Sequence, residues 1–437
     1  MQKFIVMSAD ALVKEDLKIL EKMPNYRKYV RGGACTESML SVYPTVTYAA
    51  HTAMATGCVP GKTGITGNFE KIEPATFEHP WVLDHKFVKV PDIFTAAKRA
   101  GLTTASVFWP VTGNHPDVDY LINEWPGCAP DIPIAEALKT QGSSEEMREI
   151  ARMYAGEMRR SGDHPGCDYF IADCAAEIIR RHAPDLIMIH PANVDGARHS
   201  SGVFSEDAEI AVRETDDMIG IVCRAMEAAG YGKELNFLLV SDHGQLNVER
   251  ILNVNALFAD LGWIALNDKG EIRDWKVWAM SHGMCACIIL KDPENAVFKG
   301  EVEKKLRELC AEGVYGIGDV LNEQEARDRY GYWGNFSFVI DSGPKGLTAF
   351  GESCSHPLVS LMHNLSDYRH GHASHGYLPE KGPQPVFCAK GPAFKENYVG
   401  KAGRIFDLAP TLAAAMGIEF FDCDGEARTD LLRADRK

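Results

Sequence analysis

Short apolar runs alternate with longer amphipathic segments through the first half of the chain. Phe4–Ser8, Asp185–His190 and Asn236–Ser241 have apolar interiors between polar residues, as expected for strands that are buried on both faces. Cys167–Arg181 and Glu206–Gly230 instead repeat apolar residues at helical spacing. Strands that alternate with helices predict an α/β fold with a mostly parallel central sheet and helices on both faces.

The pattern changes after about residue 250. Further strands and helices are predicted there, but we assign no candidate metal ligand to the ends of these strands. We interpret 250–350 as an inserted α/β cap subdomain, and 1–249 with 351–437 as one core. The remaining predicted elements are helices at 92–100, 295–313 and 407–416 and strands at 103–109, 276–280, 284–290, 336–340 and 385–389.

Composition narrows the class of protein. The chain has 437 residues, of which 45% are apolar and 24% charged, so it can bury a large core. A net charge of −15 argues against binding a nucleic-acid polymer, but a small anionic substrate is compatible with it if cations are bound. The sequence does not indicate an oligomeric state.

Cysteine spacing and hydropathy address the cellular location. The 12 cysteines are dispersed and form no CxxC pair, so we expect free thiols rather than a zinc ribbon. The apolar run at the N-terminus is too short for a signal-peptide core, and no run approaches the roughly 18 to 20 residues that span a bilayer. A cytoplasmic protein without a membrane segment is the expectation.

Carboxylates follow three of the predicted strands. Asp10 and Asp242 come after apolar runs, at the end of the strand where an open α/β sheet binds its ligands. His243 is next to Asp242, and Asp195 and His199 have the i, i+4 spacing that lets one helical turn hold one ion. Taken alone, a surface Asp–His pair is the more common explanation of such spacing.

A hydroxyl and a histidine-rich segment complete the candidates. Thr47 precedes a predicted helix at 48–56, where a cap and a nucleophile facing unpaired N–H groups are both compatible with the sequence. Alone, Asn68 reads as a turn residue after Gly67. In the segment 363–377, composition does not choose among His363, His370, His372 and His375, whereas His51 and His190 are expected to support the site from the core.

The motifs together resemble the alkaline phosphatase superfamily, and within it the nucleotide pyrophosphatase/phosphodiesterase branch. They are YPTVTYAAHTAMATGCVPGKTGITGN, DGARH, SDHG, SHGY followed by FCAKGPAF, and FDLAPTLAAAMGI, in order along the chain. Two positions depart from the family pattern: Ala11 stands where Gly is usual, and Tyr48-Ala49-Ala50-His51 replaces the common Phe-Pro-Asn-His. Neither departure changes a candidate ligand.

The resemblance assigns roles to these residues. It implies one metal held by Asp195, His199 and His375, and another held by Asp10, Asp242 and His243, with the nucleophile Thr47 beside it. It also implies that Asn68 binds a phosphoryl oxygen. Two divalent ions are expected, with Zn²⁺ favoured by mixed His/Asp ligands and Mn²⁺ the alternative.

The expected reaction is hydrolysis of a small phosphate ester through a phosphothreonine. Phosphodiester or nucleotide pyrophosphate bonds are the first choice, and phosphomonoesters and phosphonate C–P bonds are the alternatives within the superfamily. A non-catalytic metal- or anion-binding protein is a remote alternative, because no ligand or nucleophile position is missing. Aromatic residues of the cap either stack on a substrate or form the core of the cap; they are Trp275, Trp278, Tyr330, Tyr332 and Trp333.

Overall fold

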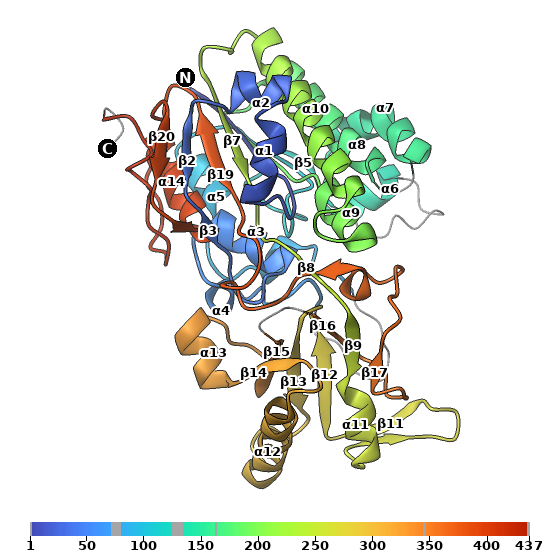
Figure 1. Cartoon of the computed structure of the whole chain (residues 1–437). Helices are drawn as coiled ribbons and strands as arrows, with labels where there is room; N and C mark the ends of the chain where they lie inside the picture. The colour runs from blue at the N-terminus through green and yellow to red at the C-terminus, as the bar shows by residue number, and fades with distance from the viewer. Residues whose placement is uncertain (1, 71–79, 125–133, 162–163, 344–346, 435–437) are drawn as a thin grey trace.

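Figure 1 shows two lobes in the computed structural model of the chain. The structure describes residues 2–70, 80–124, 134–161, 164–343 and 347–434. The larger, upper lobe holds both chain ends and is built around one sheet, and the lower lobe is drawn in the yellow and orange of the middle of the chain. This lower lobe lies within the predicted insertion, whose limits stay a prediction.

An eight-stranded sheet forms the centre of the upper lobe. Its middle strands β7, β1, β6 and β4 are parallel to one another, while β19 runs antiparallel to both of its neighbours. The predicted α/β fold with a mostly parallel sheet is therefore confirmed. In spatial order the strands are β20 (Tyr398–Gly400), β2 (Ala34–Thr36), β19 (Phe387–Lys390), β7 (Leu235–Val240), β1 (Lys3–Ser8), β6 (Leu186–Ile189), β4 (Thr104–Val107) and β5 (Tyr120–Ile122).

Alternate residues of β1 supply the two hydrophobic cores that flank this sheet. Ile5 and Met7 pack into one core, and Phe4 and Val6 into the other, as the two-residue period of a strand requires. Helices cover both faces (Figure 1). One face carries α1 (Leu17–Leu20), α2 (Pro24–Tyr29), α7 (Glu145–Ser161), α8 (Gly166–His182) and α10 (Glu206–Ala228); the other carries α3 (Thr47–Thr56), α5 (Ile93–Arg99) and α14 (Leu408–Met416).

The lower lobe has its own antiparallel sheet and core. Trp278 and Tyr332 are buried in it, so these two aromatic side chains serve packing, as one of the two sequence interpretations had it. The sheet order is β12 (Val277–Ser281), β13 (Cys285–Leu290), β15 (Phe338–Ser342) and β14 (Ile317–Asn322), with α11 (Val254–Asp260), α12 (Ala296–Glu312), α13 (Glu323–Tyr330) and the hairpin β10 (Ile264–Leu266) and β11 (Ile272–Trp275) beside it.

A three-stranded sheet joins the two lobes. In it β9 (Arg250–Asn253) pairs with β16 (Thr348–Gly351) and β17 (Val359–Ser360), so the chain enters and leaves the lower lobe side by side. The remaining short elements are β3 (Met39–Leu40), β8 (Leu246–Asn247), β18 (Ala373–Ser374), β21 (Gly403–Arg404), α4 (Pro60–Thr63), α6 (Ile134–Thr140), α9 (Asn193–Ser201), η1 (Lys14–Asp16), η2 (His85–Phe87), η3 (Tyr368–His370) and η4 (Ile405–Asp407).

Two expectations from the sequence need correction. The strand predicted at 103–109 ends at Val107, because Phe108 takes a positive φ of 60°, which is incompatible with an extended strand. The cysteines are not all free: Cys35 on β2 and Cys388 on β19 are paired as a disulfide. They lie 353 positions apart and become neighbours only when β19 inserts beside β2. Among the described helices, none is long and apolar enough to cross a membrane.

Candidate bimetallic site

The seven predicted metal-site residues come together at the carboxyl ends of the central strands. Asp10 follows β1, Asp242 and His243 follow β7, and α9 after β6 carries Asp195 and His199. Thr47 begins α3, and His375 follows β18. Parallel strands that end at one edge bring residues from distant parts of the chain into one cleft.

One group of possible ligands contains Asp195, His199 and His375. The Nε2 atoms of His199 and His375 lie 3.1 Å and 4.0 Å from carboxylate oxygens of Asp195. Each histidine donates its Nδ1 hydrogen to a backbone carbonyl, His199 to Ala373 at 2.7 Å and His375 to Thr45 at 2.9 Å. These bonds fix the tautomer, so both Nε2 lone pairs face the cleft.

The second group contains Asp10, Asp242 and His243, whose possible ligand atoms lie within 4.8 Å of one another. His243 stands between the groups, because its ligand atom is also within 4.8 Å of those of Asp195 and His375. The structure thus brings these three residues together, while His243 adjoins the first group as well, and the assignment of ligands to each metal stays a prediction.

The buried carboxylates of this cleft are suited to binding cations. Asp10 and Asp242 are buried, and burial together with neighbouring carboxylates raises the pKa of both well above the usual value. Asp10 Oδ1 and Asp242 Oδ2 have no donor among the described residues. Buried carboxylates that lack donors are stabilised by metal ions, and the His/Asp donor set fits Zn²⁺ or Mn²⁺. The residues present thus fit two divalent ions.

Histidines of the cleft respond to the same surroundings. Burial raises the pKa of Asp195, but the neighbouring imidazoles of His199, His375 and His243 outweigh it and hold that pKa below its usual value. Burial and the neighbouring imidazole of His199 lower the pKa of His375 to about 4, although Asp195 opposes the shift. Burial also lowers the pKa of His243. Neutral imidazoles are the form that binds metal.

Thr47 is not the helix cap that the sequence suggested as one alternative. Val46 is the N-cap and Thr47 is the first residue of α3, with no side-chain capping bond. The Thr47 hydroxyl lies 3.3 Å from His243 Nε2. That hydroxyl is not used to cap the helix and lies beside the first helical turn, at the positive end of the helix dipole.

Asn68 is held beside Thr47. Its Oδ1 atom accepts a hydrogen bond from the backbone N–H of Tyr48 at 2.9 Å, and its Nδ2 atom donates to the Tyr368 hydroxyl at 3.0 Å. The amide is buried and its orientation is fixed by both bonds. A donor in this place can serve an anion bound next to Thr47.

A ring of supporting contacts surrounds these residues. His190 donates to Asp10 Oδ2 at 3.0 Å, and His51 bonds the Thr47 carbonyl and the Ser8 hydroxyl, both at 2.8 Å. Both histidines were expected to support the site from the core, and they occupy such positions. Two further residues were missed by sequence reasoning: Tyr368, and Gln245, whose Nε2 donates to the carboxylate of Asp195. Gln245 lies two positions beyond His243, which is the only signal that could have indicated it.

The histidine-rich segment contributes one residue to the cleft. His375 lies there, while His370 bonds the carbonyl of Phe350 at 3.0 Å and the rings of His363 and His372 contact each other, 4.3 Å apart. Composition could not distinguish these four histidines, because the role of each depends on the residue that it contacts in the folded chain.

The backbone conformation of Ala11 explains why the family pattern usually has glycine at this position. Its φ is 56°, in the left-handed region that glycine adopts without steric cost. Its N–H donates to Asp242 Oδ1 at 3.2 Å and Arg198 donates to its carbonyl, so the turn is held on both sides. The departure from the family pattern therefore leaves the candidate ligand Asp242 oriented.

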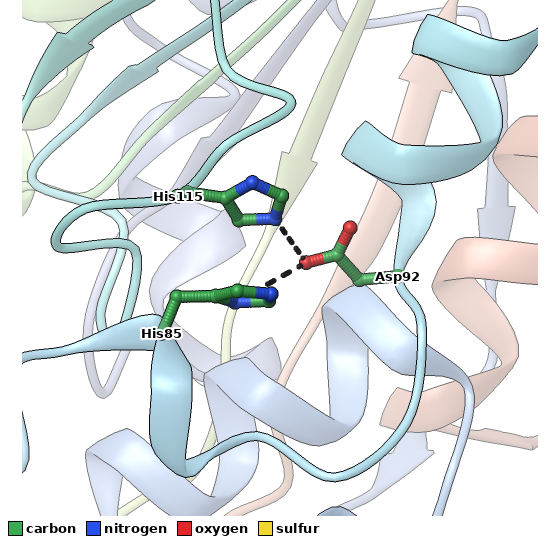
Figure 2. A group of neighbouring side chains, drawn as sticks. All are labelled: His85, Asp92 and His115. Atoms are coloured by element: carbon green, nitrogen blue, oxygen red, sulfur yellow. Dashed lines mark hydrogen bonds and ion pairs between the residues drawn. The ribbon is translucent and has the colours of Figure 1, made fainter.

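Within the described residues, one more group of His and Asp side chains could hold a metal by proximity alone. Figure 2 shows His85, Asp92 and His115 facing one another outside the cleft. Asp92 caps α5 by accepting from the Thr95 N–H, and His115 Nε2 lies 2.8 Å from the other Asp92 oxygen. His115 Nδ1 accepts from the Asp117 N–H, so the Nε2 atom carries the hydrogen that it donates to Asp92. This group is therefore a buried helix cap.

The sequence of the chain also matches the model of a known protein family. The model described as type I phosphodiesterase / nucleotide pyrophosphatase matches residues 4–335. A human ectonucleotide pyrophosphatase/phosphodiesterase, family member 1, is 24% identical over 246 residues, which are 55% of this chain and 23% of that protein. Thus the chain matches less than a quarter of this relative.

Other relatives match over more of their length. Human family member 5 is 22% identical over 95% of this chain and 75% of its own, and the human bis(5'-adenosyl)-triphosphatase of the same family is 21% identical over 95% and 78%. The solved structure of murine family member 5 has a TM-score of 0.67 at 18% identity and covers 99% of this chain and 100% of its own. An inactive threonine variant of that murine protein, in complex with AMP, has a TM-score of 0.68 at 19% identity. These structures share the fold of this chain.

Proposed function

Because the chain belongs to the type I phosphodiesterase/nucleotide pyrophosphatase family, we propose that it is a metal-dependent hydrolase of phosphate esters with Thr47 as its nucleophile. The observation that carries this proposal is the Thr47 hydroxyl, 3.3 Å from His243 and not used to cap its helix. A hydroxyl that does not cap its helix and lies against both groups of proposed metal ligands is suited to nucleophilic attack.

The proposed reaction has two steps. The Thr47 oxygen attacks phosphorus, a Thr–O–P bond forms, and the ester bond to the leaving alcohol breaks. Water then attacks the same phosphorus, which breaks the Thr–O–P bond and restores the hydroxyl. Bound divalent ions would lower the pKa of the Thr47 hydroxyl and neutralise charge on the attacking and leaving oxygens.

The remaining residues of the cleft orient these groups. Asn68, whose Oδ1 is held by the Tyr48 N–H at the start of α3, is placed to donate from its Nδ2 to a non-bridging oxygen. Asp195, His199 and His375 would hold one ion, and Asp10, Asp242 and His243 the other. Zn²⁺ is the proposed metal because both groups mix imidazole and carboxylate donors.

The proposed substrates are phosphodiesters or pyrophosphates of nucleotides. Two similar proteins support this choice: one is named a bis(5'-adenosyl)-triphosphatase, and another was solved with AMP. In the latter the inactive variant replaces a threonine, which agrees with a threonine nucleophile. Hydrolysis of monoesters or phosphonates by the same residues is the alternative that the following experiment separates.

Initial rates on bis(p-nitrophenyl) phosphate and p-nitrophenyl phosphate test the proposal. Zinc-loaded protein is compared with chelator-treated protein and with Thr47→Ala. The matched control is Thr52→Ala, because Thr52 is a buried threonine one turn further along α3 whose hydroxyl bonds the Tyr48 carbonyl.

The expected result is diester cleavage that needs metal and falls at least about 1,000-fold in Thr47→Ala, while Thr52→Ala stays close to the wild type. A monoester preference would assign a phosphatase. Turnover that survives the loss of the Thr47 hydroxyl would contradict the mechanism.

A further inference from the structure

Tyr368 lies over the cleft, although no part of the proposed mechanism uses it. Its ring stacks on His375, with centroids 5.6 Å apart and planes at 19°. The same ring meets His199 edge-on at a centroid distance of 5.4 Å. Both imidazoles are proposed metal ligands, so the phenol is the side chain that lies next to the metal-binding atoms of the first group.

The Tyr368 hydroxyl is joined to the amide placed for phosphoryl oxygens. Asn68 Nδ2 donates to it at 3.0 Å. Among the described residues, no acceptor takes the hydroxyl hydrogen itself, and only one of the two hydrogens on Asn68 Nδ2 is used. A phenol is protonated at neutral pH, and a hydroxyl that accepts one hydrogen bond becomes a stronger donor for another. Two donors thus lie side by side, and Asn68 is also bonded to the N–H of Tyr48, the residue after Thr47.

The two residues after Tyr368 are held by β16, by Glu352 and, through Glu352, by Ser281 of the lower lobe. Arg369 donates to Glu352 Oε1 at 2.9 Å, and Glu352 Oε1 also accepts from the Ser281 N–H at 2.8 Å. His370 bonds the carbonyl of Phe350 on β16 at 3.0 Å. Arg369 and Glu352 are both buried, so this ion pair is rigid. The phenol is therefore fixed before any substrate binds.

We propose that the Tyr368 hydroxyl is a substrate-positioning donor that, with Asn68, clamps a non-bridging oxygen of the phosphoryl group. The clamp rests on the proposed hydrolase function and adds to it a role for the inserted lobe, which places one of the two donors. A preorganised donor aimed at an anion needs no reorganisation when charge develops on the phosphoryl oxygens.

The test compares Tyr368→Phe with wild type, with Asn68→Ala and with the double variant. Tyr29→Phe is the matched control, because the half-buried Tyr29 hydroxyl bonds Glu227 at 2.9 Å between α2 and α10, outside the cleft. Two properties are measured for each zinc-loaded protein: kcat/KM for bis(p-nitrophenyl) phosphate, and the dissociation constant of inorganic vanadate by calorimetry. Metal stoichiometry and melting temperature show whether each variant is intact.

The clamp predicts that Tyr368→Phe lowers kcat/KM about 10- to 100-fold and weakens vanadate binding about tenfold, with two metal ions retained. Asn68→Ala and the double variant should then differ by less than about threefold, since the donors act as a unit. Tyr29→Phe should match the wild type.

Other outcomes overturn the clamp. If Tyr368→Phe is as active as the wild type, or faster, the ring only covers the cleft. If the wild type binds vanadate but hydrolyses neither ester, the proposed function fails while vanadate affinity still decides the clamp. If vanadate binds equally to wild type and Tyr368→Phe, or to neither, the clamp is wrong.

Discussion

The side-chain oxygen of Asn68 accepts a hydrogen bond from the backbone N–H of Tyr48, at a distance of 2.9 Å. This bond joins the loop that carries Asn68 to the first turn of α3. The residue of α3 that it reaches comes directly after Thr47. It leaves the amide nitrogen as the group that faces the cleft. The orientation of Asn68 is therefore tied to the position of the proposed nucleophile.

Asn68→Asp keeps the shape of this side chain and the acceptor for Tyr48, but replaces the donor by an anionic oxygen. We expect kcat/KM for phosphate esters to fall by about 100- to 1,000-fold, as for removal of a donor to a developing anion. The measurement is steady-state kinetics on zinc-loaded protein, with zinc content determined in parallel. Unchanged kinetics at full zinc occupancy would mean that Asn68 is only the turn residue that its sequence context suggests.

Gln245→Ala tests the support of the metal-binding group around Asp195. Gln245 is buried and donates to both the side chain and the carbonyl of Asp195. Without this donor the carboxylate of Asp195 is no longer held in one orientation, so we expect the affinity for zinc to fall about 10- to 100-fold. Competition with a chromogenic chelator measures it.

The control for this experiment is Gln324→Ala. Gln324 makes the same kind of bond to Asp328, at 2.7 Å, on the exposed surface of α13. Zinc affinity should not respond to that change. Equal zinc affinities of the Gln245 variant and the wild type would show that Asp195 is oriented by other contacts.

Ala11 provides a prediction about stability. Ala11→Gly relieves a positive φ but loses one buried methyl group and raises the entropy of the unfolded chain, so the free energy of unfolding should change by less than about 1 kcal/mol. Ala11→Val should lower it by roughly 2 kcal/mol or more, because a β-branched residue is strained at positive φ and the site is fully buried. Urea denaturation measures the free energy of unfolding of both variants. If Ala11→Val is as stable as the wild type, the positive φ of Ala11 does not restrict the residue at this position.

The buried carboxyl group of Asp341 should make the free energy of unfolding depend on pH. It is buried on β15 beside Lys381, and burial raises its pKa to about 7 although Lys381 opposes the rise. The folded protein therefore holds a proton between about pH 4 and pH 7 that the unfolded chain releases, and its free energy of unfolding should decrease as pH rises through that window.

Asp341→Asn should remove the part of this slope that Asp341 contributes and so make it shallower, whereas Asp319→Asn, on the partly exposed face of the neighbouring strand β14, should keep it. Urea titrations from pH 4.5 to 8 compare the three proteins. The account is contradicted if the slope of the wild type persists in Asp341→Asn.

The comparison of sequence with structure shows which features periodicity can identify. The buried strands β1, β6 and β7 were evident as apolar runs, and helix α10 from its spacing, because one element alone creates each pattern. Asp195 and His199 could be paired for the same reason, since one helical turn links them.

Features that depend on distant contacts were not visible. Cys35 and Cys388 gave no sign of pairing, and Tyr368 resembled any residue of a polar loop. The capping alternative for Thr47 failed because Val46 is the extended N-cap residue, so α3 begins one residue earlier than the pattern suggested. His375 could be chosen from its segment only through the family resemblance.

The stereochemical course at phosphorus shows whether Thr47 or water attacks the substrate. A chiral phosphorothioate diester is hydrolysed by the zinc-loaded protein in oxygen-18 water, and the configuration of the product is determined by NMR. Attack by Thr47 followed by attack by water inverts phosphorus twice, so the account predicts net retention. Net inversion would mean that water attacks the substrate directly, and Thr47 would then not be the nucleophile.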